Sequence, residues 1–216
     1  MDEYIRPTYF IDFESPAVAR AARETVAGHD PADKAGMAVK LFYFVRDTIP
    51  YRVIWGLPTR KYLKASETLS RGYGFCIPKA TLLVALARAN GIPARLHFAD
   101  IINHLASDNL QKVMGSKLFA FHGYAELLLN GTWFKVNPAF DLALSEDKGY
   151  FPVDFDGRRD AVFQKTDKLG NPHFEYVLDR GTYADVPYKE IIDTWIEKYG
   201  DAFFKLQPNP KDFQHS

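Results

Sequence analysis

The chain lacks the features that mark several common classes of protein. It has 216 residues and a single cysteine, Cys76, so an internal disulfide and a multi-cysteine zinc site are both excluded. Lysine plus arginine and aspartate plus glutamate number 27 each, so no net field favours nucleic acid or an anionic membrane. No apolar run reaches the length of a membrane span. Residues 1–13 are polar, contain acids and do not resemble a signal peptide. We expect a soluble, cytoplasmic protein whose thiol stays reduced.

Apolar residues make up 47% of the chain and aromatic residues 15%, which is enough for a sizeable core. Cap residues and apolar spacing predict helices at 15–26, at about 31–47 and at 187–204, and a single helical turn near 66–69. Alternation predicts strands at 94–101, 119–129 and 132–136, with short strands at 160–165 and 173–179. Residues 4–13 read as an extended lead-in, and residues 103–117 as a partly helical surface insertion.

The only cysteine lies where a further helix is predicted to begin. Glycines precede it, Pro78 fits a first helical turn, and Gly91 ends the helix. Residues 77–89 are apolar almost all the way round, which predicts a helix buried on most sides. A thiol at a helix N-terminus feels the positive end of the macrodipole, which lowers its pKa and favours a nucleophile. The alternative is that Cys76 is a small buried hydrophobe, and its position alone does not decide between the two.

A tight hairpin supplies a possible partner for the thiol. Asn130-Gly131 is the preferred pair for a type I′ turn. A two-residue loop pairs Leu129 with Thr132 and Glu126 with Lys135. It then places His122 on the same face as Asn137, as diagonal neighbours on adjacent strands.

An imidazole held by an amide is the arrangement that a thiol nucleophile needs. One ring nitrogen takes the sulfur proton, and the third residue fixes the tautomer through the other nitrogen. Taken singly, His122 could be an ordinary half-exposed strand histidine, and Asn137 an ordinary strand end before Pro138. The conjunction of cysteine, histidine and amide in this order favours catalysis.

Other residues are weaker candidates. Trp55, Tyr73 and Tyr124 could line a cleft or help to hold an oxyanion, although packing is the default role for each. The backbone N–H of Cys76 is the better oxyanion donor, because it points from a helix start. His97 and His104 fit no zinc spacing, and no calcium-type acidic loop occurs, so we expect no metal and no cofactor.

Several segments together resemble the core of the transglutaminase-like superfamily. The resemblance spans about residues 40–140 and rests on motifs in three separated elements, in the family's order. The motifs are Gly74-Phe75-Cys76, the Arg-Ala-Asn-Gly-Ile-Pro-Ala-Arg of 88–95, the His-Gly-Tyr-Ala-Glu of 122–126 and the Trp-Phe-Lys-Val-Asn-Pro of 133–138. Residues 44–51 also resemble the segment that usually precedes the cysteine helix.

The resemblance implies a papain-like α+β fold, with the cysteine helix packed on an antiparallel sheet. It implies a triad of Cys76, His122 and Asn137, where most of the family has aspartate at the third position. We expect one domain over 1–216, with a core at about 31–140 and a C-terminal β and helix extension at 141–216. The resemblance implies a cysteine peptidase, amidase or transglutaminase-type acyltransferase that acts on a peptide-like or other amide substrate. The alternative is a catalytically degenerate scaffold that binds peptide or protein, and the asparagine is its best support.

Overall fold

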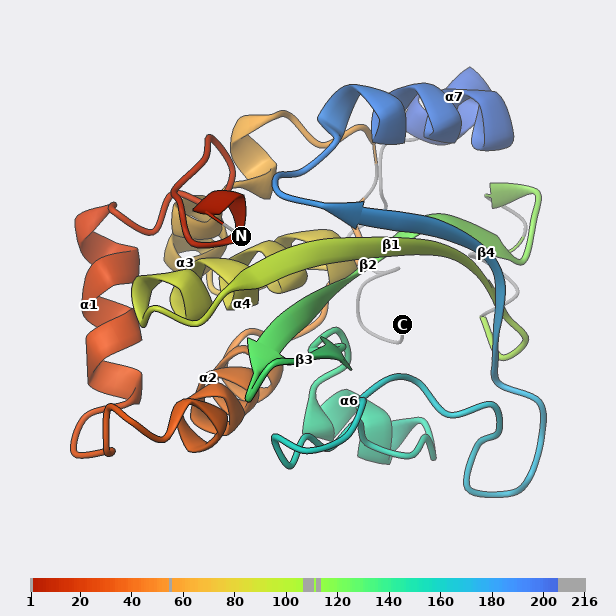
Figure 1. Ribbon diagram of the computed structural model, residues 1–216. Helices are drawn as coiled ribbons and strands as arrows, with labels where there is room; N and C mark the ends of the chain where they lie inside the picture. Colours follow the sequence, from red (N-terminus) through yellow and green to blue (C-terminus); the bar gives the residue numbers. More distant parts are fainter. Residues whose placement is uncertain (1, 55, 107–110, 112–113, 206–216) are drawn as a thin grey trace.

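The computed structural model describes residues 2–54, 56–106, 111 and 114–205, with side chains as far as Gly200 (Figure 1). The N-terminal half is helical. It contains a short 3-10 helix η1 (Asp2–Tyr4), α1 (Pro16–Thr25), α2 (Lys34–Thr48), η2 (Lys61–Leu63), α3 (Ala65–Arg71) and α4 (Cys76–Ala89). The strands are β1 (Ala94–Asn103), β2 (Leu118–Leu129), β3 (Thr132–Val136) and β4 (Phe174–Tyr183), and the later helices are α6 (Leu142–Asp147) and α7 (Tyr188–Lys205).

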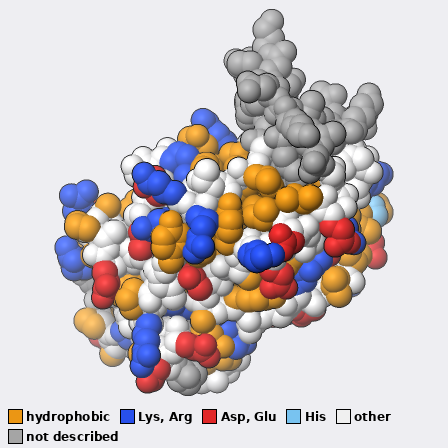
Figure 2. Space-filling model, turned by 90° about the horizontal axis from the view of Figure 1, so that it is seen from above, with side chains coloured by type: hydrophobic (Ala, Val, Ile, Leu, Met, Phe, Trp, Pro, Cys, Tyr) orange, Lys and Arg blue, Asp and Glu red, His pale blue; other side chains and the backbone are white. Residues whose placement is uncertain are grey.

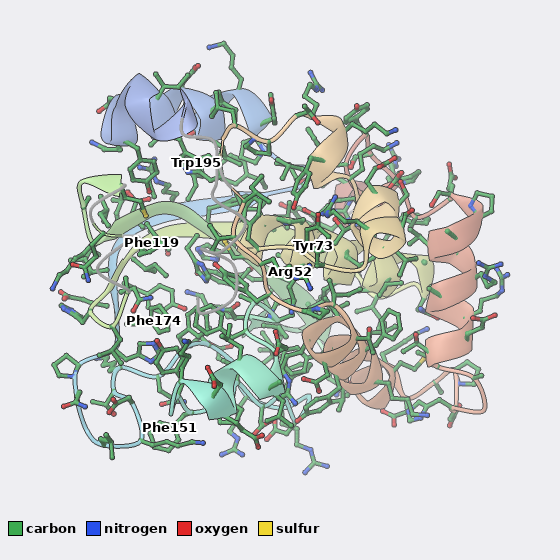
Figure 3. All side chains as sticks on the ribbon, turned by 180° about the vertical axis from the view of Figure 1, so that it is seen from behind. Arg52, Tyr73, Phe119, Phe151, Phe174 and Trp195 are labelled. Carbon is green, nitrogen blue, oxygen red and sulfur yellow. The ribbon has the colours of Figure 1, made fainter. Side chains whose placement is uncertain are left out.

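The four strands form one antiparallel sheet in the order β3-β2-β1-β4. Figure 1 shows the sheet curling through the molecule, with α4 against it and α1, α2 and α3 around α4. This is the predicted α+β architecture with the cysteine-bearing helix on an antiparallel sheet. Figure 3 shows α7 at the sheet's end, with Trp195 directed from it toward the strands.

Helix α4 is the centre of the core, as its apolar sequence predicts. Every residue from Ile77 to Arg88 is buried. The two cations among them bind backbone carbonyls: Lys79 Nζ donates to the carbonyls of Arg46 and Ile49, and the Arg88 guanidinium to that of Ala94. Strand β2 approaches the start of α4 closely, because a Cβ at Gly123 would lie 3.3 Å from Ile77 Cα. This contact brings the histidine strand up to Cys76.

Two predicted elements differ from the structure. Residues 4–13 form mostly turns and bends rather than an extended lead-in, and 160–165 provides only a single bridge, between Ala161 and Val136. That bridge stays isolated because β3 itself ends at Val136, so no ladder continues beside it. Strand β4 begins where the short strand at 173–179 was expected but runs on to Tyr183. Residues 107–110 and 112–113 of the predicted insertion at 103–117 and the candidate Trp55 lie outside the described residues.

The surface mixes charges of both signs. On the face seen in Figure 2, basic and acidic side chains are interspersed, as the equal counts of the two kinds suggest. Among the described residues, no helix has the length and apolar character needed to cross a membrane.

Candidate active site

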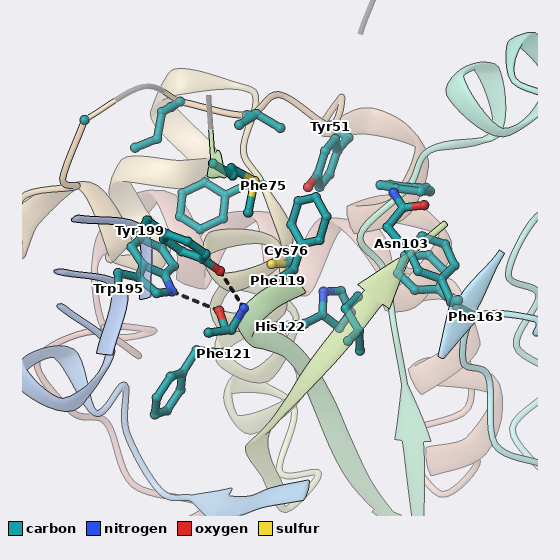
Figure 4. A pocket seen from close by; sticks show the side chains of 18 residues that line it. Tyr51, Phe75, Cys76, Asn103, Phe119, Phe121, His122, Phe163, Trp195 and Tyr199 are labelled. Atoms are coloured by element: carbon teal, nitrogen blue, oxygen red, sulfur yellow. Dashed lines mark hydrogen bonds between the residues drawn. The ribbon is translucent and has the colours of Figure 1, made fainter. Parts of the chain in front are cut away.

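The thiol of Cys76 sits at the first residue of α4 and lines a cavity (Figure 4). The backbone N–H groups of Gly123 and Ile77 and that of Cys76 itself hydrogen-bond the sulfur. Gly123 directly follows His122 on β2, and His122 lines the same cavity. The close contact between β2 and α4 therefore places the imidazole and the thiol at one site.

The predicted contact between His122 and Asn137 is present. The hairpin has the expected register, with Leu129 opposite Thr132 and Glu126 opposite Lys135. Just beyond the end of β3, Asn137 Nδ2 lies 3.0 Å from His122 Nε2. Both residues are buried, and Asn137 has no exposed surface.

The Asn137 amide is oriented by two further contacts. Its Oδ1 accepts the backbone N–H of Ala139 at 3.1 Å, and its side chain also hydrogen-bonds Tyr176. The NH₂ group therefore faces His122, and Nε2 of the imidazole is an acceptor. In the neutral ring the proton then lies on Nδ1. A base for the thiol needs the other tautomer, in which Nε2–H donates to an oxygen of the third residue.

The resting site is electrically neutral. Burial raises the pKa of the Cys76 thiol to about 11, against the smaller lowering effect of the three backbone N–H groups. Burial also lowers the pKa of His122 to about 3. The prediction of a lowered thiol pKa is wrong for this state. The free-energy cost of removing the thiolate from water exceeds the stabilisation that the thiolate gains at the helix N-terminus.

The cavity next to the thiol has a volume of about 100 Å³ and an apolar wall. Among the described residues, no aspartate, glutamate, lysine or arginine lines it. Asn103, His122 and tyrosine hydroxyls supply its few polar side-chain groups. Half of the lining residues are aromatic and come from distant segments: Tyr51, Phe75, Phe119, Phe121, Phe140, Phe163, Phe174, Trp195 and Tyr199.

Two of the weaker candidates lie away from this cavity. Tyr73 packs against arginines, with Arg52 Cζ 5.0 Å from its ring centroid (Figure 3). Tyr124 is buried beside the site but does not line the cavity. Its ring lies 4.6 Å from that of His97, stacked, and 6.3 Å from that of His122. Packing is therefore the role that their contacts support. Trp55 lies outside the described residues.

Strand β2 is distorted directly before His122, a feature that the sequence did not predict. Ala99 pairs with His122 and Ile101 with Phe119, so Ala120 and Phe121 together oppose Asp100 in a β-bulge. Phe121 has a φ of +57°, a conformation that costs a non-glycine residue roughly 1–3 kcal/mol. No local pattern of sequence marks this bulge, because its partners come from β1, β4 and α7.

A family model and one solved structure agree with the fold described above. A sequence model described as the transglutaminase-like superfamily matches residues 19–138, more than half of the chain. A solved structure described as a "putative cysteine protease" from Cytophaga hutchinsonii is 13% identical, with a TM-score of 0.53 over 87% of this chain and 48% of that one. A second, a "putative protease" from Parabacteroides distasonis, is 14% identical over 62% of this chain and 24% of that one, with a TM-score of 0.40.

These likenesses concern the fold. The chain spans about half the length of the Cytophaga protein. No curated protein matches it.

Proposed function

The chain belongs to the transglutaminase-like superfamily, and on that premise we propose that it processes amide bonds through a thioester on Cys76. The observation that carries the proposal is the hydrogen bond between Asn137 and His122 at a cavity that Cys76 also lines. A nucleophile, a base and an orienting group on three elements fulfil the requirements of thiol catalysis.

The reaction begins with a neutral thiol and a neutral imidazole, after the Asn137 amide has turned its Oδ1 toward Nε2 and the ring proton has moved from Nδ1 to Nε2, which leaves Nδ1 free to accept the thiol proton. As Sγ bonds to the substrate carbonyl carbon, the thiol proton passes to His122, and backbone N–H groups at the start of α4 stabilise the oxyanion. The imidazolium then gives the proton to the leaving amine as the C–N bond breaks, which leaves the thioester. Water attacks next, its proton returns through His122 to sulfur, and the acid is released.

Hydrolysis is the simplest outcome, since it needs only access for water. An amine acceptor would give transfer by the same steps but needs a second channel. The uncharged aromatic cavity supports a peptide-like substrate that presents an uncharged, apolar group beside the scissile carbonyl.

The test is to incubate the protein with apolar peptide anilides and nitrophenyl esters and to record the intact mass. We expect an adduct of the acyl group on Cys76 and release of the amine or phenol. Cys76→Ser, which is close to isosteric, should keep the fold and form no thioester. Product release by Cys76→Ser at the wild-type rate would end the covalent-thiol mechanism.

The second candidate function is a peptide-binding scaffold without catalysis. The neutral resting site favours it, because a thiol with a pKa of about 11 is almost fully protonated at pH 7. Slow alkylation at pH 7 fits both candidates and does not separate them. Saturable binding of the same peptides without any acyl adduct, in the wild type, would establish the scaffold instead.

A further inference from the structure

The residues that hold the strained bulge before His122 are charged or polar and largely buried. Asp100, 3% exposed, accepts the backbone N–H of Phe121 at 2.9 Å. Arg180 of β4 binds the same carboxylate with two nitrogens, Nη2 at 2.8 Å from Oδ2, and its Cζ lies 4.2 Å from the centroid of the Phe121 ring. Arg180 thus holds the Asp100 carboxylate in place, and that carboxylate binds the Phe121 N–H of the bulge.

Arg180 reaches this position because β4 is itself irregular. Phe98 pairs with Gly181 and Ala99 with Asp179, so Arg180 is the extra residue of a second bulge on the other side of β1. The bulge of β2 therefore lies opposite Asp100, and the bulge of β4 next to it lets Arg180 reach the Asp100 carboxylate. Bulges commonly redirect a side chain next to an active site.

The other bulge residue, Ala120, is held by α7. Its carbonyl accepts Trp195 Nε1–H at 2.9 Å, and its N–H donates to the Tyr199 hydroxyl at 2.6 Å. Figure 4 draws both bonds, with the two rings at the wall of the cavity that Cys76 lines. The backbone groups that the bulge removes from the β1 ladder are thus satisfied from α7.

We propose that Asp100, Arg180, Trp195 and Tyr199 are positioning residues that set the direction of the His122 imidazole through the bulge at Ala120 and Phe121. The proposal rests on the proposed function for its catalytic meaning. Three of the four residues lie beyond residue 138, where the family match ends. The C-terminal segment thereby belongs to the site: it builds the cavity wall and fixes the residue before the base.

A purely structural role would lower stability without a specific effect on His122, so the test measures the NMR signals of the His122 ring. The full chain is labelled with ¹⁵N-histidine, and the His122 ring signals are assigned by their loss in His122→Gln. Trp195→Phe removes the hydrogen bond to the Ala120 carbonyl, Tyr199→Phe removes the hydroxyl that accepts Ala120 N–H and donates to the Leu118 carbonyl, and both keep a ring. Arg180→Met removes the ion pair. We expect the ring ¹⁵N shifts of His122 to move or broaden in all three, and Arg180→Lys to restore them in part.

The control is Arg46→Met, which breaks the ion pairs that a buried arginine of α2 makes with Asp47 and Asp154, away from the bulge. It should leave the His122 signals unchanged. Wild-type His122 signals in the three folded variants, or an equal change in Arg46→Met, would overturn the positioning role.

The same variants are assayed for acyl-enzyme formation with an apolar nitrophenyl ester. We expect the rate constant for acylation to fall about five- to twentyfold, with a smaller change in the concentration that half-saturates the enzyme. Absence of acylation in the wild type would contradict the proposed function, whereas the ring signals would still decide the positioning.

Discussion

The amide of Asn137 can present only one of its ends to His122, and its neighbours determine which. Ala139 N–H occupies Oδ1, so the NH₂ end faces the imidazole. This orientation favours the tautomer that cannot take a proton at Nδ1. To act as a base, His122 needs an oxygen opposite Nε2. Asn137 supplies one only if its amide group rotates by about 180°, which breaks the hydrogen bond from Ala139 N–H to Oδ1.

Asn137→Asp tests this reading directly. One carboxylate oxygen can keep the Ala139 bond while the other accepts Nε2–H. The negative charge should raise the pKa of His122 from about 3 and favour a thiolate–imidazolium pair, since an opposite charge at hydrogen-bond distance stabilises the ionised form. We expect alkylation of Cys76 by iodoacetamide at pH 7 to become about tenfold faster or more. Asn137→Ala, which removes the orienter, should not accelerate it. Superimposable rate–pH profiles for the three proteins would show that Asn137 is not coupled to His122.

At this scale the sequence predicted the chemistry better than the energetics. The contact between His122 and Asn137 follows from strand alternation and the Asn130-Gly131 turn, which are local. The thiol pKa was predicted in the wrong direction because desolvation depends on rings contributed by distant segments, such as Phe163 and Trp195. Asp100 and Arg180 were not predicted as a pair, because only the folded sheet brings residues 80 positions apart together.

Among the elements, α4 and α2 are linked by a lysine in an unusual place. Lys79 has no exposed surface, and its Nζ donates to the carbonyls of Arg46 and Ile49 at the end of α2. These are the carbonyls that a helix end leaves without partners. Burial lowers the pKa of Lys79 to about 7, so the folded chain gives up this proton well before the unfolded chain does.

The sign of the resulting pH dependence follows from proton counting. Between pH 7 and the ordinary lysine value of 10.5, the unfolded chain binds a proton at this residue that the folded chain does not. The free energy of unfolding should therefore rise from pH 7 to 8.5, by up to roughly 1.4 kcal/mol per pH unit. Urea unfolding at several pH values measures this slope, and Lys79→Met should flatten it. Equal slopes in the two proteins would exclude Lys79 as the source.

Element boundaries show where local pattern stops being informative. Helix α4 and the hairpin of β2 and β3 were predicted closely, because Pro78, Gly91 and the Asn-Gly turn mark them in sequence. The bulges of β2 and β4 were not, since their irregular residues are stabilised by tertiary hydrogen bonds rather than by local propensity.

Among the described residues, His122 and His173 are two buried histidines whose pKa burial lowers. His122 lies inside the site. His173 is 2% exposed, between the rings of Tyr150 and Phe174, each 3.9 Å away. Burial lowers the pKa of His122 to about 3 and that of His173 to about 4. Both values lie below the ordinary histidine value of 6.5, so the unfolded chain binds two protons in mildly acidic solution that the folded chain excludes.

This linkage predicts a protein that loses stability in acid before its carboxylates are protonated. The contribution of the two histidines is complete above pH 6.5 and declines as the pH falls toward 4 and then 3, because protonation then favours the unfolded chain. We expect a loss of a few kcal/mol in the free energy of unfolding between pH 7 and 4.5, measured by urea titration. His173→Gln should reduce the slope in this window, and the double variant with His122→Gln should reduce it further. Since Lys79 acts in the same direction above pH 7, stability should keep rising from pH 4.5 to about 8.5. A maximum near pH 5 would contradict the burial of neutral histidines as the main titrating groups of the fold.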